Sequence, residues 1–159
     1  MQAEIEVVIE HGKSTCSLLG QVIAFAARGP WNDEAMKNGS KVVGRLILEV
    51  DKTQPWGQIS CLAGEAIMPP STFDIFVKQS SLRREAGLTA LALVICDSDI
   101  ITTIRQQLSD CYTRAGINHA FFDDITSAAR WLSEQGIAVD MEPVRAFYAS
   151  VPFLPDNLT

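Results

Sequence analysis

A strand-like run, a break and a helix follow one another between residues 23 and 50, and this order constrains the fold more than any other feature of the chain. The apolar run from 23 to 27 is interrupted at Gly29 and Pro30, a pair typical of turns. Asn32 is a preferred N-cap residue, and apolar residues recur after it at spacings of three and four. The segment therefore predicts a strand, a sharp turn and a helix with one apolar face.

The same strand-to-helix plan recurs along the rest of the chain. Apolar runs at 58–63, 88–96 and 118–122 predict strands, and each precedes a stretch with helical spacing. Short connections between them favour a partly parallel sheet with right-handed crossovers. β-Branched runs before residue 28 predict an antiparallel meander of three strands. We therefore expect a single-domain α/β fold with a mixed sheet, antiparallel N-terminal strands and about four helices.

Polar residues at the expected helix starts suit capping. Ser71 with Asp74 three residues later resembles a capping box in an acidic variant. Asp97 or Ser98 is expected to cap the next helix, and one of the aspartates at 123 and 124 the last. An alternative for Ser71 and the adjacent Thr72 is phosphorylation, because a phosphate is favoured at a helix N-terminus.

The length of 159 residues fits one domain, which we place at residues 1–136. Residues 137–159 are too apolar for a free tail, so we expect an extension that packs on the domain or on a dimer partner. The net charge of −6 disfavours nucleic acid and anionic membrane surfaces as partners. The longest apolar run, 88–96, is too short to span a bilayer, and no secretory leader is evident, so we expect a cytoplasmic protein.

The residue types that carry catalysis do not form a strong pattern. Asp97, Asp99 and Asp123 follow strands and would suit Mg²⁺ in a phosphatase of the haloacid-dehalogenase type, but their spacing is too short for that family. Neither His11 nor His119 has an evident nucleophile as partner, and no phosphate-binding glycine loop is present. The four cysteines form no C-x-x-C pair and suit buried reduced thiols. We expect no enzyme, no cofactor and no metal site.

Four aromatic residues are candidates for the wall of a small apolar pocket: Trp31, Trp56, Phe73 and Phe76. The alternative is that they only pack in the core, which is the more common use of large aromatic side chains. If they line a pocket, the chain would bind a small apolar ligand or a lipid.

Several short segments, in a fixed order, resemble the STAS-like domains of the anti-sigma-factor-antagonist superfamily. They are Gly29-Pro30-Trp31-Asn32, Pro55-Trp56, Gly87-Leu88 with the apolar run that follows, Phe121-Phe122-Asp123-Asp124, and Ala128-Ala129-Arg130-Trp131-Leu132. The resemblance covers roughly residues 5 to 136 and implies a mixed sheet with helices largely on one face.

Relatives in this superfamily act mainly as non-enzymatic interaction modules, and some related folds bind lipids or small apolar ligands. The phosphoswitch members carry an Asp-Ser-Ser-Gly-like motif, which the stretch from 62 to 72 lacks; Ser71 is the nearest candidate. The first hypothesis is therefore a regulatory or protein–protein interaction module of bacterial type, with an unidentified protein partner or a homodimer. A small apolar-ligand-binding domain is the alternative, and a magnesium-dependent phosphatase is the third.

Overall fold

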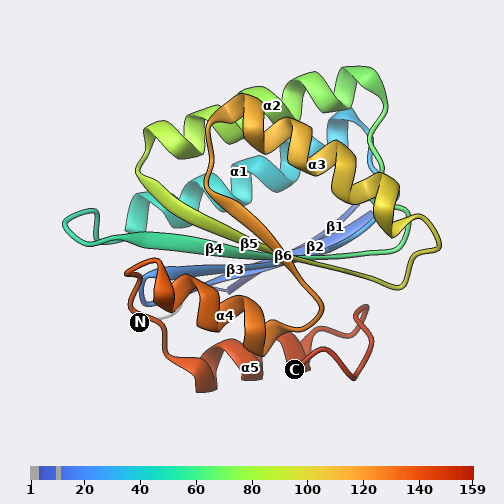
Figure 1. The fold of residues 1–159 in the computed structure, drawn as a ribbon. Coiled ribbons are helices and arrows are strands. Elements are labelled where there is room, and N and C mark those ends of the chain that lie inside the picture. Colours follow the sequence, from blue (N-terminus) through green and yellow to red (C-terminus); the bar gives the residue numbers. More distant parts are fainter. Residues whose placement is uncertain (1–3, 10–11) are drawn as a thin grey trace.

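The computed structural model describes residues 4–9 and 12–159, with the backbone alone for residues 4–9 and 12. A six-stranded sheet lies at the centre, with the strands in the order β1-β2-β3-β4-β5-β6 (Figure 1). The strands are β1 (Glu4–Ile9), β2 (Gly12–Leu19), β3 (Val22–Arg28), β4 (Trp56–Ala63), β5 (Leu88–Cys96) and β6 (His119–Phe122). The helices are α1 (Asp33–Glu49), α2 (Pro70–Glu85), α3 (Ile101–Ala115), α4 (Ile125–Glu134) and α5 (Met141–Ser150).

The sheet is mixed, as the sequence predicts. β1, β2 and β3 are antiparallel neighbours, which confirms the N-terminal meander. β3, β4, β5 and β6 are parallel neighbours, each following the last by way of one helix. The α/β class and the antiparallel N-terminal strands are therefore confirmed.

The helices cover both faces of the sheet, so the expectation of about four helices largely on one face needs correction. α1, α2 and α3 lie over one face, whereas α4 and α5 lie over the other (Figure 1). The strand order explains the first group, because successive right-handed crossovers in one direction place their helices on the same face. The other face is then left for the chain that follows β6.

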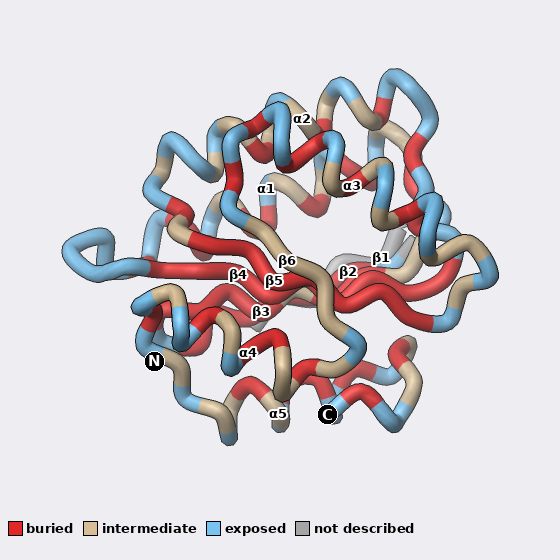
Figure 2. Tube along the Cα trace, viewed as in Figure 1, coloured by how far each residue is buried: buried red, intermediate tan, exposed pale blue. Residues whose placement is uncertain are grey.

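Two apolar layers result, one on each side of the sheet. Figure 2 shows the buried central strands between the two groups of helices. β4 is buried along its whole length, and its side chains alternate between the layers. Ile59, Cys61 and Ala63 face α4 and α5, while Leu62 belongs to the layer under α1, α2 and α3. The four cysteines are buried and free of disulfides, as expected.

The segment after α4 packs against the sheet. Val144, Phe147 and Tyr148 of α5 are buried in the layer below it. The Tyr148 hydroxyl donates to the Ile59 carbonyl oxygen at 2.8 Å and accepts from the Phe25 backbone N–H at 3.2 Å. Residues 137–158 therefore complete the lower layer within the same chain.

The turn between β3 and α1 requires glycine at its centre. Gly29 and Pro30 are joined by a cis peptide bond, and the Gly29 N–H donates to the Ala63 carbonyl oxygen at 3.0 Å. A side-chain carbon at Gly29 would overlap the carbonyl oxygen of Glu65. This close approach aligns the turn with the end of β4 and fixes the position of Trp31.

Helix starts agree with the sequence at α1 and α4 and differ at α2 and α3. Asn32 caps α1 by accepting from the Ala35 N–H at 2.8 Å, and Asp124 caps α4 by accepting from the Ser127 N–H at 2.7 Å. The caps expected at Ser71 and at Asp97 or Ser98 are wrong: Pro69 and Ile100 hold those positions, and neither has a side-chain cap. Proline at the first position of α2 shifts its start, since Pro suits that place.

No helix in the described part of the chain is both long enough and apolar enough to cross a membrane.

Candidate functional site

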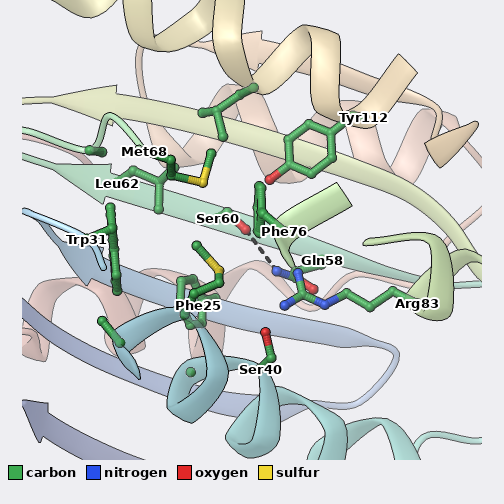
Figure 3. Close-up of a pocket in the computed structure, with 15 residues that line it drawn as sticks. Phe25, Trp31, Ser40, Gln58, Ser60, Leu62, Met68, Phe76, Arg83 and Tyr112 are labelled. Atoms are coloured by element: carbon green, nitrogen blue, oxygen red, sulfur yellow. Dashed lines mark hydrogen bonds between the residues drawn. The ribbon is translucent and has the colours of Figure 1, made fainter. Parts of the chain in front are cut away.

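A pocket lies between the sheet and the layer formed by α1, α2 and α3. Its volume is about 40 Å³, and side chains from all three helices, from β3 and β4 and from two loops line it (Figure 3). The apolar part of the lining consists of Phe25, Trp31, Ala35, Met36, Gly39, Leu62, Ala66, Met68, Phe76, Leu108 and Tyr112. The polar part consists of Ser40, Gln58, Ser60 and Arg83.

β4 supplies the polar floor of the pocket through its alternation. Gln58, Ser60 and Leu62 point to the same side of the sheet and all line the pocket. The Gln58 amide donates to the Ser60 hydroxyl at 2.8 Å. Two hydrogen-bonding side chains on one face of a strand buried on both sides are unusual, because burial of polar groups costs free energy unless they are paired.

Two polar atoms of the pocket lining have no partner among the residues that the structure describes. Gln58 is only 1% exposed, yet its Oε1 has no hydrogen-bond donor, and the buried Ser40 hydroxyl also has no partner. Figure 3 shows the guanidinium of Arg83 pointing toward the Gln58 amide, with Ser40 on the opposite wall. Most buried polar groups in proteins are paired, so unpaired ones at a pocket wall suggest a missing partner.

Among the lining residues that the structure describes, Arg83 brings the only charge. Arg83 lies in the last turn of α2. Burial lowers the pKa of its guanidinium, but the guanidinium stays protonated at neutral pH. Among the described residues, the ionisable groups that act on its charge are Tyr112, Cys111 and Cys16. Burial raises the pKa of Cys16 to about 12 and of Cys111 to about 11, and it also raises the pKa of Tyr112. All three are therefore neutral near pH 7 and leave the guanidinium charge unbalanced.

The far end of the pocket is apolar. Trp31 is 8% exposed and lies at the opposite end of the pocket from Arg83 (Figure 3). Phe76 and Tyr112, whose rings meet edge to face with their centroids 5.6 Å apart, lie on the side of the pocket nearer to Arg83 (Figure 3). The pocket is therefore polarised, with an aromatic end and a cationic end.

The loop before α2 is held in place over the apolar end. The Met68 N–H donates to Gln107 Oε1 at 2.8 Å, and Gln107 Nε2 donates back to the Met68 carbonyl oxygen at 2.8 Å. Because Gln107 lies on α3, this pair of hydrogen bonds fixes the Met68 side chain over the pocket. Methionine is flexible, so the wall can still adjust to a ligand.

Small residues of α1 create the space. Gly39 is buried at the pocket, and a side-chain carbon built on it would meet no heavy atom within 4 Å. Glycine weakens a helix by about 1 kcal/mol relative to alanine. The chain thus accepts a weaker helix at a position where the missing side chain leaves a cavity.

The structure brings two of the four predicted aromatic residues into the pocket. Trp31 and Phe76 line it. Trp56 is buried in the same apolar layer but outside the lining, and Phe73 packs against that layer under the guanidinium of Arg114, 5.4 Å from the ring centroid.

Ser71 and Thr72 lie at the start of α2, away from the pocket lining. The Thr72 hydroxyl donates to Asp33 Oδ1 at 2.6 Å, and the Ser71 hydroxyl donates to the same oxygen at 3.0 Å. Ser71 is exposed, whereas Thr72 is buried. These hydrogen bonds join the N-terminal ends of α1 and α2, two walls of the pocket.

Two of the three acidic residues considered for Mg²⁺ form separate ion pairs, and Asp99 is exposed. Asp97 pairs with Arg28 at 2.6 Å, and Asp123 pairs with Arg105 at 3.4 Å. Within the part of the chain that the structure describes, no group of three or more His, Cys, Asp or Glu side chains is placed to hold a metal ion. His119 Nε2 lies 3.3 Å from the Ser109 hydroxyl, outside the pocket lining; His11 lies outside the described residues.

Sequence reasoning missed the polar half of the site. The signal available for Gln58 and Ser60 was their alternation with Gly57, Ile59 and Cys61 in a run expected to be a buried strand. No local signal marks Arg83, since a basic residue near the end of a helix is ordinary.

Compared with protein-family models, with curated protein sequences and with solved structures, the chain gives no match in any of the three comparisons. The geometry of the site is therefore the basis for assigning a function.

Proposed function

We propose that this chain is a non-catalytic binding domain that takes a small molecule with an apolar body into the pocket between the sheet and α1, α2 and α3. The observation that carries the proposal is the polarised cavity itself, with Trp31 at one end and unpaired polar atoms of Gln58 and Ser40 at the other. Pockets that combine an apolar wall with a few converging polar groups are typical ligand sites. The role agrees with the small-ligand alternative drawn from the sequence.

The size of the cavity limits the ligand. A cavity needs about 10–15 Å³ to hold one water molecule, so a volume of about 40 Å³ has room for about three. A ligand with a short chain fits this space, and rotation of Met36 and Met68 would admit a somewhat longer one. Drug-sized ligands need pockets of about 300–1,000 Å³ and are too large.

The regulatory role that the STAS-like resemblance suggests is compatible with such a domain, since a bound ligand can control an interaction surface. It remains part of the proposal and rests on the resemblance alone.

The test of ligand binding uses 1-pentanol, a neutral short-chain probe, with the methyl groups of Met36 and Met68 observed by NMR. We expect saturable shifts of both methyl signals, because both side chains line the pocket. Gly39→Leu places a side chain in the cavity and should abolish the shifts.

Gly44→Leu is the matched control. Gly44 lies on the same helix, also has free space around a built side-chain carbon, and is not part of the pocket lining. This variant should keep the shifts. Pentanol binding that persists in Gly39→Leu, or that moves neither methionine, would show that the pocket is not the site.

A further inference from the structure

The cationic end of the pocket has more hydrogen-bonding capacity than the protein itself uses. The guanidinium of Arg83 makes no ion pair with any residue that the structure describes, although Arg28, Arg105, Arg114 and Arg145 each pair with a carboxylate. An unpaired cation at a largely apolar wall costs free energy, because desolvation is not repaid by a partner. Arg83 is half-buried, and no described residue offers its guanidinium a carboxylate.

Three elements direct polar groups to this end. Arg83 comes from the last turn of α2, Gln58 from the middle of the sheet and Ser40 from α1. Gln58 is 1% exposed and its Oε1 lacks a donor, while the Ser40 hydroxyl lacks any partner. The three side chains line the same cavity (Figure 3). Their unused capacity points to a polar group of a ligand between them.

We propose that the natural ligand of the pocket is a small monocarboxylic acid, whose carboxylate pairs with Arg83 and whose apolar chain lies toward Trp31. The inference rests on the proposed function, which it makes more specific. The planar guanidinium fork matches the two oxygens of a carboxylate and can bind both. An acidic protein with a net charge of −6 gains no general attraction for anions, so recognition depends on this local cation.

The lining favours a carboxylate over a phosphate. In the described part of the lining, Arg83 is the only charged residue, and the remaining polar side chains are Ser40, Gln58 and Ser60. A phosphate monoester carries a charge of about −1.5 to −2 at pH 7 and three acceptor oxygens, which one guanidinium neither neutralises nor saturates. A single negative charge on two oxygens is matched by one arginine.

The unpaired Gln58 oxygen adds a second requirement. Because Gln58 Nε2 already donates to Ser60, the group that remains is an acceptor, which a carboxylate cannot satisfy. A hydroxyl next to the carboxylate would donate to it. We therefore expect a hydroxy acid to bind more tightly than the plain acid of the same chain length.

The experiment compares probes that share a five-carbon chain and differ in the head group: pentanoate, 1-pentanol, pentylamine and pentyl phosphate. Binding is followed by the Met36 and Met68 methyl signals at pH 7. We expect pentanoate to bind at least about tenfold more tightly than 1-pentanol, as a charge-assisted hydrogen bond implies, and pentylamine and pentyl phosphate to bind more weakly than pentanoate.

Arg83→Gln should reduce the affinity for pentanoate by at least about tenfold, to that for 1-pentanol or below it, because the carboxylate then loses its cationic partner. Lys78→Gln is the matched control, since Lys78 is an exposed cation on the same helix and lies outside the lining. It should change neither affinity. The melting temperature of Arg83→Gln should equal or exceed that of the wild type, because the variant loses an unpaired cation.

The outcomes separate this inference from the proposed function. If 1-pentanol binds in the pocket and pentanoate does not bind more tightly, the carboxylate inference is wrong and the proposed function stands. If no probe binds, the proposed function fails as well. Tighter binding of pentyl phosphate than of pentanoate would assign the site to phosphate esters and overturn the inference.

A second measurement does not depend on the folding of a variant. The Nε–H signal of Arg83 in the wild-type protein should shift on addition of pentanoate and not on addition of 1-pentanol. 2-Hydroxypentanoate should bind more tightly than pentanoate, and Gln58→Met should remove that difference. If the Arg83 Nε–H signal does not shift on addition of pentanoate, the proposal is wrong.

Discussion

At the scale of single residues, two glycines of α1 separate the stability of the helix from the cavity beside it. Gly39→Ala and Gly44→Ala should each raise the free energy of unfolding by about 1 kcal/mol, because alanine is the better helix former and neither methyl group meets a clash. Only the methyl at 39 enters the pocket. Urea unfolding and 1-pentanol titration of both variants should therefore give equal stabilisation and weaker binding for Gly39→Ala alone.

If Gly39→Ala instead lowers the stability, the space beside Gly39 is filled in solution and the cavity is not open. If both variants weaken the binding of 1-pentanol, the cause is a change in helix α1 as a whole and not the space that the methyl group at 39 occupies.

The residue scale also shows how far the sequence could predict the site. Trp31 was identifiable because it follows the Gly29-Pro30 break and precedes the Asn32 cap, a local pattern that places it at a helix start. Arg83 and Gln58 lie 25 positions apart on different elements. Their meeting depends on the rotation of α2 about its axis and on the face that β4 presents, which local spacing does not define.

At the scale of elements, the stability of the contact between the N-terminal ends of α1 and α2 should decrease at acidic pH. Hydrogen bonds from Thr72 and then Ser71 lower the pKa of Asp33 below its ordinary value of 3.8. The ionised form is therefore favoured in the folded state, and its contribution to stability is complete above pH 3.8 and is lost as the pH falls through the folded pKa.

Asp33→Asn should thus lower the free energy of unfolding at pH 6, and the difference from the wild type should shrink below pH 3.8, the ordinary value for the carboxyl. Urea unfolding at several pH values measures it. Glu34→Gln is the control, since Glu34 is an exposed acid in the same first turn. If the difference in the free energy of unfolding between Asp33→Asn and the wild type stays constant as the pH falls below 3.8, the Asp33 carboxylate does not stabilise the contact.

The elements themselves were predictable to different degrees. The meander and the parallel strands follow from runs of apolar residues and from short connections, which are local properties. A cap at Ser71 places the start of α2 two residues too late, because Pro70 suits the first helical position better than Ser71 suits the cap. The side of the sheet taken by α4 could not be predicted, because no strand follows α4 in the described part of the chain and the rule for right-handed crossovers therefore does not place it.

At the scale of the whole molecule, the sheet separates two apolar layers. In the layer under α4 and α5, the Tyr148 hydroxyl reaches the backbone of β3 and β4. The layer under α1, α2 and α3 contains the pocket. A ligand that fills the pocket should therefore stabilise the protein as a whole, since it binds the folded chain and finds no site in the unfolded one.

Because residues 137–159 pack in the lower layer, we expect them to be necessary for folding. Seven buried apolar side chains lie in this segment: Ile137, Val144, Phe147, Tyr148, Val151, Leu154 and Leu158. Burial of one such side chain contributes about 1.5–3 kcal/mol, so the segment contributes at least about 10 kcal/mol. Domains are stable by only about 5–15 kcal/mol in total. A chain that ends at residue 136 should therefore show no cooperative unfolding transition in urea.

A shorter truncation provides the comparison. A chain that ends at Leu154 keeps α5 and loses Leu158, together with the 2.8 Å hydrogen bond from the Ile125 N–H to the Leu158 carbonyl oxygen. It should still unfold cooperatively, with a loss of a few kcal/mol, about the sum of one buried leucine and one hydrogen bond. Cooperative unfolding of the chain that ends at 136 would instead make residues 1–136 a domain in their own right, and the lower layer an addition to it.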